Sequence, residues 1–479
     1  MKKVCLLFTF SVNCILLLAQ TVGDKLAKAV SELEKDPQME AALVSLYVMD
    51  ADNGSLVYEK NSRYGMAPAS TQKLFTAAAI LELLGEKFRY KTAINLYEYA
   101  NDPLKSGMIE IRGSGDPSLG SWRYAGTKKE ALLKDWSKAL VKAGSGLKLT
   151  SIYLYDLPPG NMQTIPDGYI WQDMGNYYGA GTSLLNWNEN QYDIVFRSGA
   201  TGTPATIIGL DTMQKQLKYR FSVFAGAAGS GDNTYIYAAP FAREAVVNGT
   251  IPPNQRSFTI SGSMPDAGYT LALSLQDQVA LSGGIIDPKI QIHSSRGPVN
   301  LESADPVTSP TISSSLITSI SHSSPILDSL VFWFLRKSIN LYGEAFVKTI
   351  AYERKDGYRL DKGLDHITNF WTENGIRKSE ISLLDGSGLS PQNRVTTRAL
   401  CQVLKYSAGR SWFPAFQDAI PTYNGMKMKS GSINGARAFA GYHKSAKGKK
   451  YIFAMVVNNY NGNAGEVVKK MYDVLDLLK

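Results

Sequence analysis

The chain has 479 residues, with 51 Lys and Arg against 42 Asp and Glu, and a formal net charge of +9. This length is too great for a single hydrophobic core, so two or three domains are expected. The positive charge is spread along the chain and lacks the clustering typical of nucleic-acid binding, so we expect no nucleic-acid partner.

The first 20 residues have the layout of a secretory signal peptide. Lys2 and Lys3 precede an apolar run over residues 4–18, which is too short to span a bilayer comfortably. We therefore expect residues 1–20 to be removed and the mature protein to be exported, with no transmembrane anchor left after cleavage. An uncleaved anchor is the alternative. Only Cys401 lies beyond this segment, so no internal disulfide is expected.

The two ends of the mature chain have similar patterns. Residues 24–36 have helical spacing, an apolar run over 41–50 leads into an Asn-Gly turn and a second short strand, and good helix formers fill 70–85. Near the C-terminus, 428–442 and 451–457 read as two strands, and an amphipathic helix follows over 464–479. This symmetry predicts one sheet built from both termini.

The middle of the chain has a different composition. Residues 90–290 are rich in Gly, Ser, Thr and Tyr, with short alternating strands and few helical stretches, which predicts an inserted, mainly β region. Helical patterns resume at about residue 313 and continue to 350, and the apolar run over 330–335 reads as a buried helix.

Ser70 and Lys73 form the first candidate catalytic pair, at the start of the helix expected over 70–85. Residues three apart lie on one face of a helix, so the lysine can reach the serine hydroxyl. A neutral lysine can take the serine proton, and burial or a second cation would lower its pKa for that role. The pattern alone also fits a capping serine with a solvated lysine. No HExxH, Cys-rich or GxSxG pattern indicates a metal site or a Ser-His-Asp enzyme.

Two later triplets strengthen this interpretation. Ser338 and Asn340 lie in a helix-rich stretch, and Lys429 begins the sequence Lys-Ser-Gly on a predicted edge strand. Together with Lys429, Ser338 and Asn340 could relay a proton to a leaving amine, and Lys429 could also bind a substrate carboxylate.

The edge strand also supplies candidate substrate-binding groups. Ser430 could donate a hydrogen bond to the substrate carboxylate, and Gly431 would leave the strand edge open to substrate. The backbone N–H groups of Ser70 and Ser432 are the expected oxyanion donors.

The three elements together resemble the penicillin-recognising serine enzymes, whose motifs are SxxK, SxN and KTG. The chain is most similar to the class C low-molecular-mass penicillin-binding proteins, the D-alanyl-D-alanine carboxypeptidase/endopeptidase family. The segments that carry this resemblance are 68–73 (PASTQK), 115–119 (GDPSL), 178–180, 188–190, 338–340 followed by Glu344, 385–390 (DGSGLS) with Asn393 and Thr396, 429–431, 441–442 and Asn458. The departures are Ser430 where Thr is usual, Gly343 where Ala is commoner, and Pro391 where a basic residue often stands.

The resemblance implies an α/β (α+β) fold. A penicillin-binding/β-lactamase-like catalytic domain, with an antiparallel sheet flanked by helices, would carry a large, mainly β insertion with a nested subdomain. We expect the catalytic domain over 21–90 and 291–479, the insertion over 91–195 and 259–290, and the nested subdomain over 196–258.

The resemblance also implies the activity. The expected enzyme is a periplasmic serine D-Ala-D-Ala carboxypeptidase and endopeptidase, which acts on peptidoglycan peptides without a cofactor and is acylated by β-lactams. The family insertion carries an acidic residue that meets the amine of the substrate's diamino acid, and Asp173 is the candidate by local similarity; an ordinary turn aspartate is its alternative. The rival functions are a catalytically silent peptidoglycan-binding protein and a β-lactamase, which the 268 residues between Ser70 and Ser338 disfavour.

Overall fold

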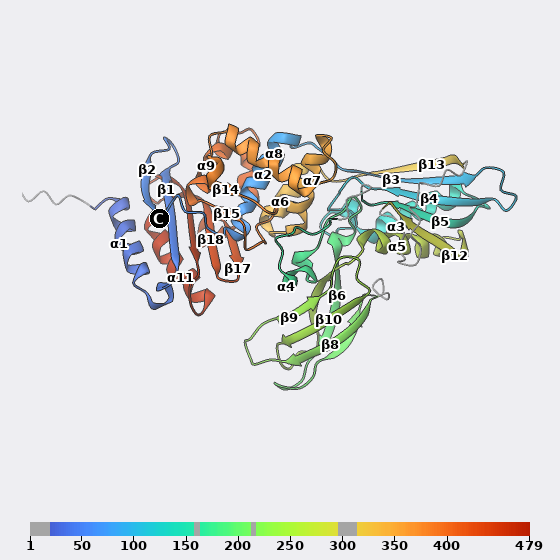
Figure 1. Cartoon of the computed structure of the whole chain (residues 1–479), viewed down its shortest axis with the longest axis horizontal. Coiled ribbons are helices and arrows are strands. Elements are labelled where there is room, and N and C mark those ends of the chain that lie inside the picture. The colour runs from blue at the N-terminus through green and yellow to red at the C-terminus, as the bar shows by residue number, and fades with distance from the viewer. Residues whose placement is uncertain (1–19, 158–162, 212–216, 296–313) are drawn as a thin grey trace, which may run out of the picture.

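The computed structural model describes residues 20–157, 163–211, 217–295 and 314–479 (Figure 1). The predicted signal peptide lies outside these residues except for Gln20, and so do Cys5 and Cys14. Within the described ranges, no helix is both long enough and apolar enough to cross a membrane.

Both ends of the chain contribute to one six-stranded sheet, as the sequence predicts. The strand order is β16-β17-β18-β19-β1-β2, and β1 pairs with β19 along its whole length, from Leu43 opposite Asn458 to Asp50 opposite Tyr451. The central strands are apolar on both faces, as expected for a sheet covered by helices on both sides. The strands are β1 (Leu43–Asp50), β2 (Leu56–Lys60), β16 (Thr422–Tyr423), β17 (Met426–Ile433), β18 (Ala436–Lys444) and β19 (Lys450–Asn458).

Helices cover both faces of this sheet. On one face, α1 (Val22–Glu34) and α11 (Ala464–Leu475) bury Leu26, Val467 and Met471 in a shared core. The larger core on the other face surrounds α2 (Lys73–Leu84), whose first nine residues are all buried, so α2 lies at the centre of a helical layer (Figure 1). The other helices of that layer are α6 (Leu327–Arg336), α7 (Asn340–Glu353), α8 (Leu360–Glu373), α9 (Thr397–Ala408) and α10 (Phe413–Ala419).

The inserted region contains a five-stranded sheet. In Figure 1 this sheet forms an arm to the right of the main lobe, which is the lobe that holds the six-stranded sheet. Its strand order is β12-β5-β4-β3-β13, and two 15-residue helices pack their apolar residues into its core. The elements are β3 (Lys91–Tyr99), β4 (Ser106–Arg112), α3 (Lys129–Ala143), β5 (Lys148–Tyr155), α5 (Ala267–Leu281), β12 (Ile285–Ser294) and β13 (Ser314–Ser323).

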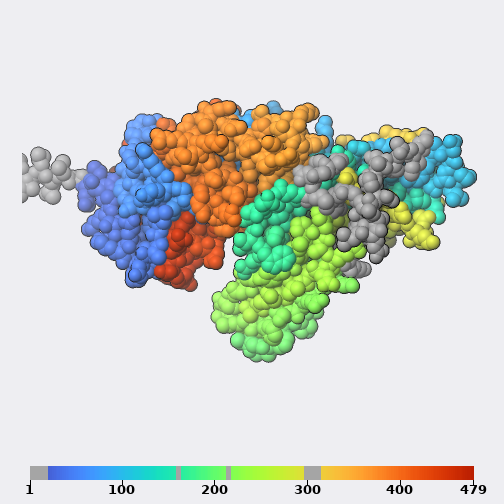
Figure 2. All heavy atoms as spheres, viewed as in Figure 1, coloured from blue at the N-terminus to red at the C-terminus, as the bar shows by residue number. Residues whose placement is uncertain are grey.

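Two three-stranded sheets form the lobe that projects below the rest of the molecule in Figures 1 and 2. One has the order β11-β6-β7 and the other β8-β10-β9. Strands β6 and β11 lie at the two ends of the expected nested subdomain, and β6 pairs with β7, which lies within it. The strands are β6 (Gln191–Arg197), β7 (Thr206–Leu210), β8 (Lys218–Ala225), β9 (Asn233–Tyr237), β10 (Glu244–Ile251) and β11 (Phe258–Ser263).

Several expectations are wrong in detail. The single strand expected over 428–442 is two strands, because Gly435 (φ +70°) allows a tight turn between β17 and β18. Residues 314–323 form strand β13 instead of a helix. The expected return of the chain from the insertion near residue 291 is also wrong. Because β12 and β13 both pair within the inserted sheet, the chain returns to the main lobe after Ser323.

The insertion also contains more helix than its sequence predicts. Helices α3 and α5 lie within the stretch expected to contain little helix. Helix α5 is apolar on most of its surface, and its apolar residues show no strong helical period. Periodicity alone therefore does not distinguish its sequence from that of a buried strand. The buried helix expected over 330–335 is confirmed as part of α6.

Candidate active site

Ser70 lies in a 3-10 turn, Ala69–Gln72, and not in the first turn of an α-helix as the sequence predicts. The turn begins with Ala69 in a left-handed conformation (φ +45°), which a residue with a side chain adopts only where its surroundings hold it. The α-helix α2 starts at Lys73, which is fully buried. Its Nζ donates hydrogen bonds to Ser70 Oγ at 3.0 Å, to Asn340 Oδ1 at 2.6 Å and to the Ser387 carbonyl at 2.7 Å.

The surroundings of Lys73 favour its neutral form. Burial lowers the pKa of Lys73 to about 7, although the carboxylates of Asp385 and Glu344 act in the opposite direction. A lysine with this pKa carries a free electron pair in a large fraction of molecules at neutral pH. The amine is therefore able to accept the proton of Ser70, to which it is already hydrogen-bonded.

The second motif brings Asn340 to the site. Asn340 is the first residue of α7, and it accepts the hydrogen bond from Lys73 while its Nδ2 donates to the Tyr178 carbonyl at 2.8 Å. Ser338 precedes this helix and has a left-handed backbone (φ +58°). In the described part of the chain, the partners of the Lys73 amine are Ser70, Asn340 and Ser387, and Ser338 is not among them.

The third motif lies on β17, the strand next to the sheet edge. Lys429 is buried and donates to the Ser430 carbonyl at 2.9 Å. Burial and the charge of Lys73 lower the pKa of Lys429 well below its usual range. The charge of Lys73 therefore disfavours the charged form of Lys429, whereas the lowered pKa of Lys73 itself comes from burial.

Gly431 allows β17 to approach the nucleophile. A Cβ on Gly431 would lie 2.5 Å from the Pro68 carbonyl oxygen and 3.0 Å from the Ser70 backbone nitrogen, so a side chain would separate the two segments. Ser432 follows and is exposed, whereas Ser430 is partly buried. The strand edge and the Ser70 backbone thus form one surface beside the serine.

Asp385 shapes the loop that faces Lys73, a role that its motif does not predict. Its buried carboxylate accepts hydrogen bonds from the backbone of Ser387 (3.1 Å), Gly388 (2.6 Å) and Ser390 (2.6 Å), and from Asn393 Nδ2 (3.0 Å). These bonds fold the loop so that the Ser387 carbonyl meets the Lys73 amine. The DGSGLS pattern identifies the loop, but nothing in the sequence reveals this contact.

Glu344 connects the same loop to α7. Its Oε2 accepts from the Gly386 backbone at 2.8 Å, and its Oε1 accepts from the Tyr169 hydroxyl at 3.0 Å. Burial and the charge of Asp385 raise the pKa of Glu344 to about 7. Tyr169 comes from the insertion and has no recognisable motif, so sequence reasoning could not have found it.

Residues 164–182, here called the wall loop, form the side of the site that the insertion supplies. Asp173 lies on the short helix α4 (Trp171–Met174), partly buried and hydrogen-bonded to Tyr178. Burial raises the pKa of Asp173, and the Tyr178 hydroxyl partly offsets this effect. Since Asn340 binds the Tyr178 carbonyl, Asp173 is linked to Lys73 through two residues.

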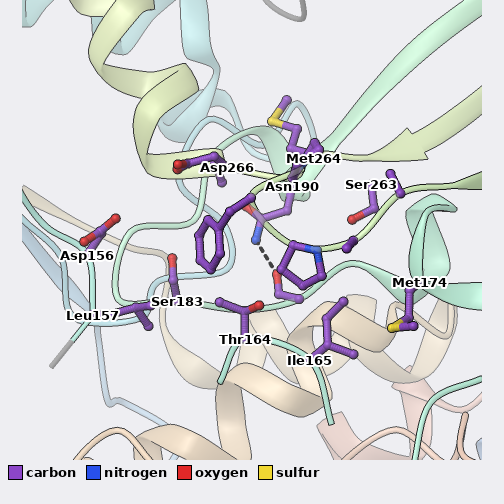
Figure 3. A pocket seen from close by; sticks show the side chains of 17 residues that line it. Asp156, Leu157, Thr164, Ile165, Met174, Ser183, Asn190, Ser263, Met264 and Asp266 are labelled. Atoms are coloured by element: carbon purple, nitrogen blue, oxygen red, sulfur yellow. Dashed lines mark hydrogen bonds between the residues drawn. The ribbon is translucent and has the colours of Figure 1, made fainter. Parts of the chain in front are cut away.

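A small cavity lies behind the wall loop (Figure 3). Its volume is about 30 Å³, which has room for no more than a few water molecules. Three residues of the wall loop line it, namely Thr164, Ile165 and Met174, and so does Asp266 at the start of α5. Ser70 is not among the lining residues, so this cavity is not the substrate site.

The donor atoms of the site are those of acid–base and acyl-transfer chemistry. Across the described ranges, no group of three or more His, Cys, Asp or Glu residues is placed to hold a metal ion. The structure brings Ser70, Lys73, Asn340, Lys429 and Gly431 together, with Asp173 on the adjoining wall.

Comparisons with known proteins identify the family and the fold of the chain. The model of the D-Ala-D-Ala carboxypeptidase 3 (S13) family matches residues 26–478. A D-alanyl-D-alanine carboxypeptidase from Actinomadura sp. is 24% identical, covering 93% of this chain and 84% of its own, and D-alanyl-D-alanine carboxypeptidase DacB from Haemophilus influenzae is 22% identical, covering 88% and 86%. The crystal structure of penicillin-binding protein 4 (dacB) from Haemophilus influenzae superposes with a TM-score of 0.74 at 19% identity, over 95% of this chain and 99% of that one. The fold is therefore that of penicillin-binding protein 4.

Proposed function

Because the chain belongs to the D-Ala-D-Ala carboxypeptidase 3 (S13) family, we propose that it is a serine-type D-alanyl-D-alanine carboxypeptidase and endopeptidase acting on peptidoglycan peptides. The observation that carries the proposal is the contact between the buried Lys73 amine and Ser70 Oγ at 3.0 Å. It supplies a nucleophile and a base in hydrogen-bonding distance, within a family named for its D-Ala-D-Ala carboxypeptidase activity.

Acylation begins at Ser70. Lys73 Nζ takes the hydroxyl proton while Oγ forms a bond to the carbonyl carbon of the penultimate D-Ala, and the carbonyl electrons move to oxygen. The backbone N–H groups of Ser70 and Ser432 bind that oxyanion. The approach of Gly431 to the Ser70 backbone supports this pairing of donors.

Departure of the leaving group needs a proton on its nitrogen. We assign this delivery to the group of Ser338, Asn340 and Lys429, which receives the proton held by Lys73. The hydrogen bond between Lys73 and Asn340 and the effect of Lys73 on the pKa of Lys429 support a shared proton site. The carbon–nitrogen bond then breaks, and D-Ala, or the amine of a cross-link, leaves.

Water completes the cycle by attacking the acyl-enzyme and releasing Ser70. A β-lactam is the same kind of substrate, because its strained amide acylates the same serine. Lys429 and Ser430 bind the carboxylate of either molecule. Asp173 pairs with the amine of the diamino acid, and its position on the wall loop beside Tyr178 supports that assignment.

The protein works outside the cytoplasm in this proposal. The signal-peptide pattern over residues 1–20 supports export to the periplasm, where peptidoglycan is found. The mature enzyme would consist of a catalytic domain from both chain ends and an insertion with a nested subdomain, the last built from the β6–β11 segment.

The test is the intact mass of the mature protein with and without benzylpenicillin, beside a Ser70→Ala variant. We expect a stable increase of one drug mass in the wild type, none in the variant, and release of D-Ala from a pentapeptide by the wild type alone. An unchanged mass with rapid loss of the drug would indicate a β-lactamase. An unchanged mass with intact drug and intact peptide would overturn the mechanism in favour of a binding protein.

A further inference from the structure

Lys348 is a fully buried lysine that the mechanism does not use. It lies on α7, and its side chain is 1% exposed. Its Nζ donates to the carbonyls of Gln163 at 2.7 Å, Thr182 at 3.1 Å and Thr164 at 3.3 Å. The Tyr358 ring lies beside the same amine, 5.5 Å from Nζ to its centroid. The Lys348 amine thus meets three backbone acceptors.

Thr164 and Thr182 are the two ends of the wall loop, and Gln163 immediately precedes it. The Thr182 backbone N–H donates to the Thr164 carbonyl at 3.0 Å and closes the loop at a neck, and Lys348 binds both sides of that neck. The neck is tightly packed, because a Cβ on Gly181 would lie 2.9 Å from Ile165 Cγ1. Figure 3 shows Thr164 and Ile165 at this point, beside the small cavity.

Helix α7 holds the wall loop at three places. Asn340 binds the Tyr178 carbonyl, Glu344 binds the Tyr169 hydroxyl, and Lys348 binds the neck. Residues four apart lie on one face of a helix, so these three side chains form one stripe along α7. The stripe fixes the loop along its length, from the tip near Lys73 to its base.

A buried lysine is not an efficient way to stabilise a fold, and burial lowers the pKa of Lys348 to about 7. Removing the charge from water is costly, and an apolar residue of similar size often stabilises a core equally well or better. The three carbonyl partners offset this cost while requiring one specific position of the neck. The arrangement therefore specifies geometry more than it adds stability.

We propose that Lys348 is a positioning residue for substrate recognition: it fixes the neck of the wall loop to α7 and so holds Asp173 and Tyr178 at the distance from Ser70 that the peptide substrate requires. This inference rests on the proposed function, in which Asp173 binds the substrate amine. Acylation by a small β-lactam without an amine on its side chain does not need Asp173, so it should depend little on Lys348.

The test compares two reactions of a Lys348→Met variant, which keeps the length of the side chain and removes its donors. We expect kcat/KM for a D-Ala-D-Ala peptide carrying a diamino acid to fall about 100-fold, mainly through KM, whereas the rate constant of acylation by benzylpenicillin stays within about threefold. Lys348→Arg, which keeps charge and donors, should recover part of the peptide activity. Lys362→Met on α8, at an exposed lysine paired with Asp365, is the matched control and should change neither reaction.

Equal losses in both reactions would overturn the proposal, since Lys348 would then support the catalytic centre as a whole, and so would unchanged KM for the peptide. If Lys348→Met does not fold, Tyr358→Phe removes the hydrogen bond between the Tyr358 and Thr182 hydroxyls at the same neck and must show the same selectivity to a smaller extent. Failure of wild-type Ser70 to be acylated would instead count against the proposed function, so the two failures can be distinguished.

Discussion

The face of α7 that meets the wall loop and the inserted five-stranded arm are both buried regions of this molecule, but they bury different chemistry. Five titratable side chains that are at most 1% exposed lie on α7 or around the active site beside it: Lys73, Glu344, Lys348, Asp385 and Lys429. The core of the arm consists of Leu, Ile, Val, Trp and Met side chains. One of its buried carboxylates, Glu110, is paired with Arg112 at 2.7 Å and accepts from Asn95 at 2.9 Å.

The difference separates residues kept for chemistry from residues kept for stability. Burying a charge without an opposite charge beside it lowers stability, so such groups persist where catalysis requires their shifted pKa values. The charge in the arm is neutralised by its neighbour and needs no functional explanation. Changes to the α7 face should therefore alter activity first, and changes to the arm should alter stability first.

The largest expected effect is that of Lys73→Met. Without a base, the acylation rate constant for benzylpenicillin should fall by about 10²- to 10⁴-fold, because Ser70 keeps its proton. Stopped-flow or quenched acylation followed by mass measurement checks this, with circular dichroism to show that the variant folds.

The matched change in the arm is Glu110→Gln, which should leave the acylation rate constant unchanged and lower the melting temperature. If Glu110→Gln reduced acylation as much as Lys73→Met, the contrast between the two regions would be wrong.

The next effect is a pH dependence of acylation. The base must be neutral, and the pKa of Lys73 is lowered to about 7, so the neutral fraction falls as the pH drops below that value. The acylation rate constant should decrease about tenfold for each pH unit below 7 and level off above it. A profile from pH 5 to 9 on the wild type and on Glu110→Gln should give the same midpoint, and a flat profile between pH 5 and 7 would rule out Lys73 as the base.

The smallest effect concerns the packing of the loop against α7. A Cβ on Gly386 would lie 2.3 Å from the Gly343 carbonyl oxygen, so Gly386→Ala should destabilise the protein by about 1–3 kcal/mol. A Cβ on Gly126, in the insertion, meets nothing within 4 Å, and Gly126→Ala should change stability by less than about 0.5 kcal/mol. Urea denaturation of both variants measures the difference, and equal midpoints would contradict the close packing.

Much of the fold follows from local patterns. The sheet shared by both termini is predicted because its strands are apolar runs bounded by turn residues, with amphipathic helices beside them. Local patterns do not predict strand β13, because its sequence is rich in Ser and Thr and the strand is exposed along most of its length. Its place is determined by pairing with β3, more than 200 residues earlier, which no local pattern encodes.

The site was predictable only as far as its motifs extend. Ser70, Lys73, Asn340 and Lys429 belong to patterns, whereas Tyr169 reaches Glu344 through tertiary structure alone. Gly343 illustrates a different limit. A glycine at this position suggests only a loss of helix propensity. In the structure a Cβ there would lie 3.0 Å from the Gly386 backbone, so the small size of Gly343 lets the loop that contains Gly386 pack closely on α7.

The pairing of β1 with β19 has a consequence for the time at which the enzyme can become active. Synthesis proceeds from the N-terminus, so Ser70 exists long before Lys429 and before the strand that completes the sheet beside β1. Until then the nucleophile lacks its neighbours, and the first strands have no partner from the other end. We therefore expect the active site to be complete only after β17, which carries Lys429, has joined the sheet.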